Sequence, residues 1–202
     1  MRAETRGGVT FDGGGDQTWG GLSFNGGAHD QTWDGFKFAN GRPFETGVIV
    51  FGGYGLASAH HITLRNITIL PSIAGDPATN KDHSIYFSSD ATHDILIEDY
   101  TTTPGPGIAS ALQFHHSPNV YNLTVRRMHV VGTQSAITTY DGTVHDVLIE
   151  DSDIRDARDA ALNVGAAGAN VVLRNIVSTN SHGTYYPNGK PAGLSLVNCS
   201  FQ

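Results

Sequence analysis

Several features that would place this chain in other protein classes are scarce in it. It has one cysteine, Cys199, so no disulfide forms within the chain and a disulfide-based fold is excluded. No apolar run approaches the roughly 18 residues that span a bilayer, and residues 1–15 lack the apolar core of a signal peptide. Lys and Arg number 12 against 19 Asp and Glu, which offers no electrostatic attraction to phosphate backbones or anionic lipid. We therefore expect neither nucleic acid nor membrane as a partner.

Helical periodicity is also missing, whereas glycine contributes 25 residues and β-branched residues alternate with polar ones. The one helix-like stretch, residues 156–162, falls where a strand repeat requires a turn into a strand, so we assign no helix there. The sequence therefore predicts an all-β protein. A length of 202 residues fits one domain. Because residues 9–11 and 194–197 already read as strands, we expect residues 1–202 to be one domain from a longer protein.

A repeat runs through the chain. Six segments align without gaps, their ends 24 to 33 residues apart, and we call them B segments: 32–35, 63–66, 96–99, 124–127, 148–151 and 172–175. A second alternating set, the A segments, lies between them: 48–51, 84–87, 111–114, 136–139, 161–164 and 193–196. A unit this short cannot bury its apolar face alone, and stacking copies creates one continuous core. The repeat predicts a single-domain parallel β-helix of about six to seven coils.

The aligned positions form columns that test this prediction. One outward column alternates in charge, which stabilises neighbouring strands: Asp34, Arg65, Glu98, Arg126, Glu150 and Arg174. The next column is polar or glycine, as expected at a turn: Gly35, Asn66, Asp99, Arg127, Asp151 and Asn175. Alternation predicts an inward-facing core: Ile85, Phe87, Ile97, Leu112, Phe114, Val125, Ile137, Ile149, Leu162, Val164 and Leu173.

The repeats resemble a known superfamily. LRNITI (64–69), HSIYFSS (83–89), HDILIEDYT (93–101), HDVLIEDSDI (145–154) and VVLRNI (171–176) look like the right-handed parallel β-helix repeats of the pectate-lyase-like superfamily. The resemblance covers residues 30–200 and implies a right-handed solenoid, an extracellular location and a polysaccharide partner. That superfamily includes lyases, glycoside hydrolases and non-catalytic adhesins, so the fold does not decide among these functions.

The A segments are the candidate site, because the connections leading into them carry the long insertions, at 70–83 and 178–192, that commonly flank the binding face of a solenoid. We interpret Tyr86, His115 and Tyr140 as one exposed column on three successive coils. Such rings suit stacking on sugars, with Gln113 and Asn163 hydrogen-bonding to hydroxyl groups. The alternative is that the rings only stabilise the sheet.

The residue types on these segments match two kinds of polysaccharide cleavage. A β-eliminating lyase needs a cation, a base and an acid, and the catalytic candidates are Lys81, His83, His115 and Tyr140. An inverting hydrolase needs two carboxylates about 6.5–9.5 Å apart. Asp82 and Asp141, at opposite margins of the A segments, fit that role or substrate binding. The paired aspartates of polygalacturonases and the carboxylate cluster of calcium-dependent pectate lyases are not evident.

A histidine precedes four of the B segments: His29, His60, His93 and His145, followed by Asp30, His61, Asp94 and Asp146. A metal site is one interpretation. We favour a turn repeated with every coil, and we expect no metal or other cofactor. The sequence predicts a carbohydrate-active lyase or hydrolase acting on a bacterial or plant polysaccharide. The alternatives are a non-catalytic module that binds glycan or protein, and a structural spacer.

Overall fold

The protein is described from a computed structural model of the 202-residue chain. The structure describes residues 2, 8–13, 21–39, 47–52, 58–70, 82–88, 91–103, 108–165, 168–186 and 189–202, with the backbone alone at 82, 108, 116–118 and 140–143. Every regular element among them is a β-strand, which confirms the all-β prediction. In this part of the chain no helix is long and apolar enough to cross a membrane.

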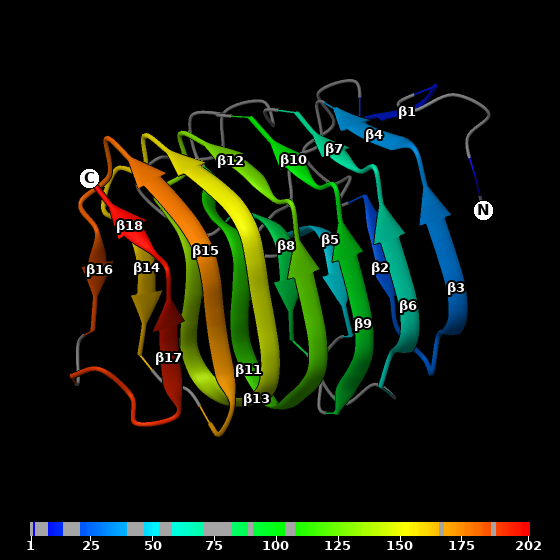
Figure 1. Cartoon of the computed structure of the whole chain (residues 1–202). Helices are drawn as coiled ribbons and strands as arrows, with labels where there is room; N and C mark the ends of the chain where they lie inside the picture. Colours follow the sequence, from blue (N-terminus) through cyan, green and yellow to red (C-terminus); the bar gives the residue numbers. More distant parts are fainter. Residues whose placement is uncertain are drawn as a thin grey trace.

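The strands lie on three faces of a solenoid (Figure 1). Face A, built from the A segments other than 193–196, contains β2 (Leu22–Phe24), β5 (Gly47–Phe51), β8 (Asp82–Phe87), the first part of β11 (Ile108–Arg126) and of β13 (Ser135–Arg155), β14 (Ala160–Val164) and β16 (Thr184–Tyr185). The prediction of 193–196 as an A segment is wrong: residues 194–197 pair with residues 171–174 on face B, because β16 already occupies the face A position of that coil. Face B contains β3 (His29–Asp34), β6 (His60–Arg65), β9 (Thr92–Glu98), later parts of β11 and β13, the start of β15 (Val171–Thr179) and β17 (Leu194–Val197). Face C contains β1 (Val9–Asp12), β4 (Phe36–Ala39), β7 (Thr68–Ile69), β10 (Thr101–Thr102), β12 (His129–Val131), the ends of β13 and β15, and β18 (Ser200–Phe201).

All strand pairings are parallel, and each strand pairs with the equivalent strand of the next coil. The result is a parallel β-solenoid of about five turns. The expected six to seven coils slightly exceed this number, because that count includes the terminal segment 193–196, whose strand β17 pairs on one side only. The segment 156–162 contains no helix and leads into β14, as predicted.

A single apolar core fills the solenoid, and every residue predicted to face inward is buried. On face A its centre is a row of phenylalanine rings, one per coil. Phe24, Phe51, Phe87 and Phe114 stack with ring centroids 5.0, 4.8 and 4.8 Å apart and interplanar angles of 20° or less. The rings lie parallel because in-register strands hold equivalent side chains one strand spacing apart.

The two predicted outward columns of face B are confirmed. Arg65 pairs with Asp34 at 3.0 Å, Arg126 with Glu98 at 2.7 Å, and Arg174 with Glu150. The adjoining turn column has a positive φ at every position, between 51° and 82°: Gly35, Asn66, Asp99, Arg127, Asp151 and Asn175. Asn and Asp tolerate this left-handed conformation better than most residues. Asn66 Nδ2 also donates to Asp34 Oδ1 at 2.7 Å, and this bond together with Arg65 holds the pKa of Asp34 below its ordinary value.

The phenylalanine row predicts a large effect of truncation. Phe87 is fully buried and stacks on a ring at each side, so Phe87→Ala should lower the free energy of unfolding by about 3–5 kcal/mol. Phe87→Leu, which keeps most of the volume, should cost markedly less. Urea denaturation of both variants checks this. Equal losses for the two would contradict a closely packed row.

Candidate functional site

The structure gives different amounts of information on the predicted site residues. Lys81 lies outside the described residues. Asp82, Tyr140 and Asp141 are placed by their backbone only, in β8 and β13. Side chains are described for the other five candidates, which lie on face A: His83 and Tyr86 on β8, Gln113 and His115 on β11, and Asn163 on β14.

The predicted column of Tyr86, His115 and Tyr140 is wrong. Tyr86 is in register with Gln113, and His115 with Asp141, across a register shift between Phe114 and His115. Outward positions recur every two residues along a strand, so a two-residue error keeps a side chain on the correct face but moves it along the strand. Tyr86 and His115 are therefore diagonal neighbours on adjacent coils, a relation within reach of long side chains.

The diagonal brings Tyr86 and His115 into contact. The Tyr86 hydroxyl oxygen lies 2.9 Å from His115 Nδ1, a hydrogen bond whose donor depends on the imidazole tautomer. The two rings meet edge to face, with centroids 6.2 Å apart. On its other side Tyr86 stacks on His83, with centroids 5.3 Å apart and planes 12° from parallel. We call His83, Tyr86 and His115 the face A cluster.

The members of the face A cluster differ in exposure. Tyr86 is buried at 7% exposure and His83 at 9%, whereas His115 is half-buried. The expectation of an exposed aromatic row is therefore corrected to a largely buried ring pair with one imidazole at the surface. The reason is that an outward position on a β-solenoid is not automatically solvent-exposed.

His83 is an unusual imidazole. Burial, with a smaller contribution from the charge of His115, lowers the pKa of His83 to about 3. Its Nδ1 atom is buried and has no hydrogen-bond partner in the described part of the chain. His83 is therefore neutral at neutral pH, and it packs against the Tyr86 ring as an uncharged imidazole.

The remaining two candidates line the same register row as Tyr86 without joining the cluster. Gln113 is buried, and its Oε1 accepts a hydrogen bond from Ser110 Oγ at 3.1 Å. Ser110 Oγ also lies 2.9 Å from Thr138 Oγ1 on the next coil. Asn163 is half-buried beyond Thr138 in that row, two coils from Gln113. The structure thus brings Gln113 next to Tyr86 and leaves Asn163 apart.

The histidines at the start of face B form a regular stack, as their recurrence suggested. Neighbouring rings lie 4.8 to 5.2 Å apart and within 12° of parallel, in the order His29, His60, His93, Tyr121 and His145. The residue after each ring has a positive φ, which confirms a turn repeated with every coil: Asp30, His61, Asp94, Asn122 and Asp146. Among the described residues, no three His, Cys, Asp or Glu side chains form a group suited to a metal ion.

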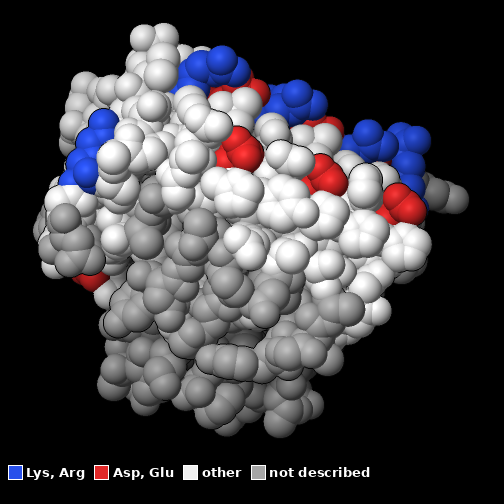
Figure 2. All heavy atoms as spheres, turned by 90° about the horizontal axis from the view of Figure 1, so that it is seen from below, with Lys and Arg blue, Asp and Glu red and all other residues white. Residues whose placement is uncertain are grey.

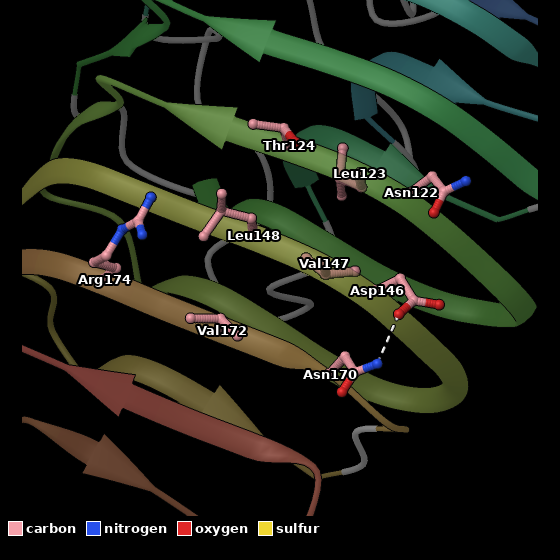
Figure 3. Close-up of a pocket in the computed structure, with 9 residues that line it drawn as sticks. All are labelled: Asn122, Leu123, Thr124, Asp146, Val147, Leu148, Asn170, Val172 and Arg174. Atoms are coloured by element: carbon pink, nitrogen blue, oxygen red, sulfur yellow. Dashed lines mark hydrogen bonds between the residues drawn. The ribbon is translucent and has the colours of Figure 1, made fainter.

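A shallow groove on face B was missed by the sequence reasoning. It has a volume of about 440 Å³ and crosses β11, β13 and β15 (Figure 3). Its lining comprises Asn122, Leu123, Thr124, Asp146, Val147, Leu148, Asn170, Val172 and Arg174. One signal could have found it: in an outward column that holds Thr32, Thr63, Leu96 and Thr124, the neighbouring positions 148 and 172 are both apolar.

Comparison with protein families, curated proteins and solved structures finds no match for this chain.

The buried imidazole predicts a pH dependence. His83 binds a proton in the unfolded chain below its ordinary pKa of 6.5 but stays neutral when folded until about pH 3. Its contribution to stability is therefore complete above pH 6.5 and falls as the pH drops from 6.5 towards 3. Relative to His83→Phe, which keeps a ring against Tyr86, the wild type should lose about 2 kcal/mol between pH 7 and pH 5. Urea denaturation at both pH values measures this difference, and a difference independent of pH would contradict the burial of a neutral His83.

Proposed function

We propose that the chain is a carbohydrate-active β-solenoid that cleaves a uronate-containing polysaccharide by β-elimination at face A. The observation that carries the proposal is the 2.9 Å contact between the Tyr86 hydroxyl and His115 Nδ1. A phenol and an imidazole in contact provide the proton donor and proton acceptor that elimination requires. The proposal includes an extracellular location, where such polymers are found.

The chemistry balances within this pair. In the tautomer with the proton on Nδ1, His115 donates to the Tyr86 oxygen, and its Nε2 lone pair takes the C5 proton of the uronate. The C5–H electrons form the C4=C5 double bond while the C4–O bond breaks, and the leaving oxygen takes the Tyr86 hydroxyl proton. The imidazolium then returns its Nδ1 proton to the phenolate across the 2.9 Å contact. The net reaction consumes no water and no cofactor.

The other face A residues have supporting roles in this proposal. His83 stacks on Tyr86 and fixes the plane of the phenol. Gln113, in register beside Tyr86, provides an amide close to the reacting atoms. Lys81, one residue before β8, is the proposed cation for the substrate carboxylate. A hydrolase built on Asp82 and Asp141 has less support, because Asp82 is in register with Ile108 and Asp141 with His115, which places their backbones at opposite ends of face A.

A screen of uronate polymers tests the reaction class. We expect the protein to release an unsaturated uronate, detected by its ultraviolet absorbance, from at least one of polygalacturonate, alginate and a glucuronan. Reducing ends released without that absorbance would indicate hydrolysis instead. Binding without either product would indicate a non-catalytic module. Neither binding nor product would indicate a spacer, and each of these last three outcomes contradicts the lyase proposal.

A matched pair of histidine variants tests the site. His115→Ala should lower turnover by a factor of about 10² or more and, through one lost hydrogen bond, lower stability by about 1 kcal/mol. His93→Ala is the control, because His93 also makes a hydrogen bond, 2.7 Å to Asp94, and also lies against aromatic rings, but on face B. It should lose similar stability and keep its turnover. Equal losses of turnover in the two variants would show that His115 acts only through stability.

A further inference from the structure

The groove on face B has an apolar floor that the fold itself does not require. Thr124, Leu148 and Val172 lie side by side across three coils and point outward, each half-buried (Figure 3). They do not contribute to the interior, which is filled by alternate residues such as Val147 and Ile149. Their outward column also holds Thr32, Thr63 and Leu96, and within it Leu148 and Val172 are two apolar residues on neighbouring coils. An outward apolar pair of this kind is typical of a contact surface.

Polar groups line both sides of this floor. On one side, Asn170 Nδ2 donates to Asp146 Oδ1 at 2.9 Å, with Asn122 one coil away in the same turn column (Figure 3). On the other side, Arg174 pairs with Glu150. Each side presents one polar group per coil, about 4.8 Å apart, with amide alternating with carboxylate on one side and guanidinium with carboxylate on the other. An apolar floor between planar hydrogen-bonding groups matches a sugar ring, whose C–H face is apolar and whose rim carries hydroxyl groups.

The charges next to the floor indicate what kind of glycan fits. A row of carboxylates runs parallel to the row of alternating basic and acidic residues (Figure 2). The turn column beside the groove contributes carboxylates on alternate coils, at Asp30, Asp94 and Asp146. Hydrogen bonds from Asn170 and His145 hold the pKa of Asp146 below its ordinary value, so this carboxylate stays ionised. A polyanion would be repelled along this edge, whereas a neutral hydroxyl-rich chain would find acceptors there.

The strands beneath the groove exclude another kind of ligand. β11 pairs with β9 and β13, β13 with β11 and β15, and β15 with β13 and β17, so each has a neighbour on both sides. An extended peptide therefore has no free strand edge to join at the groove. Recognition there depends on side chains alone.

We infer that the face B groove is a binding site for a neutral linear glycan, lying across β11, β13 and β15 with its rings on Thr124, Leu148 and Val172. This site is separate from the face A cluster and does not depend on the proposed lyase reaction. The chain would then hold a neutral polymer on one face independently of what it cleaves on another.

Titration of ¹⁵N-labelled protein with cellohexaose, xylohexaose and mannohexaose tests the inference. We expect at least one of them to shift the amide resonances of residues 124, 148 and 172, while trigalacturonate leaves them unchanged. His115→Ala should bind the hexasaccharide as the wild type does, which separates failure of this site from failure of the lyase proposal. The inference is overturned if none of the three neutral glycans binds at millimolar concentration, or if trigalacturonate shifts the same resonances.

A matched pair of substitutions locates the site. Leu148→Thr replaces a floor residue with threonine, which its neighbour Thr124 already contributes to the same column. The change should weaken binding by about fivefold or more, because apolar contact with the glycan is lost. Leu96→Thr makes the same change in the same column, one coil outside the groove lining, and should change affinity by less than about twofold. Equal effects of the two variants would overturn the assignment to this groove.

Discussion

In-register hydrogen bonding between parallel strands of successive coils is the constraint on which the rest of this structure depends. It places equivalent residues about one strand spacing apart, so each position must accept a near copy of itself as a neighbour. Phenylalanine rings satisfy this by stacking, as Phe51 and Phe87 do at 4.8 Å. Charged residues satisfy it only by alternating in sign, as Glu98 and Arg126 do.

The turns obey the same constraint at a higher conformational cost. The column after the charge ladder requires a left-handed backbone on every coil, and most coils use Asn, Asp or Gly there. Arg127 is the exception, with a φ of 54° and a long side chain. Its guanidinium group contacts Asp99 at 2.8 Å and Glu98 at 2.9 Å, and these contacts offset the less favourable backbone. Although burial opposes ionisation of Glu98, Arg126 and Arg127 keep its pKa below the ordinary value.

Face B and the core could be predicted from the sequence because each position there is read against its copies on the other coils. Ile97 and Val125 are buried, as the alternation of inward and outward residues along each strand predicted. Tyr86 and His115 could not be paired in this way, because their contact is diagonal, crosses a register shift and joins residues of different columns. The burial of His83 was equally hidden, because its register neighbours Gly47 and Ser110 carry no ring with which to compare it. The short Thr-rich strands of face C, such as β10, are too brief to show an alternation.

The same regularity separates structural from chemical positions. Rings that recur, such as His60 and His93, are explained by the turn they occupy. Among the residues that the structure describes, the face A cluster has no counterpart on other coils: one imidazole is buried and neutral, one is at the surface, and a phenol lies between them. The face B groove is a departure of the same kind, because two neighbouring positions of its column, Leu148 and Val172, are both apolar. Departures from the repeat are therefore where we place function.

The contact between Tyr86 and His115 joins the register of the coils to the proposed chemistry, and nitrogen NMR of the histidine side chains tests it most directly. In Tyr86→Phe the phenol oxygen is removed, so the Nδ1 resonance and tautomer ratio of His115 should change while those of His93, on face B, stay as in the wild type. An unchanged His115 spectrum would show that the two side chains do not meet, and would contradict both the diagonal register and the site built on it.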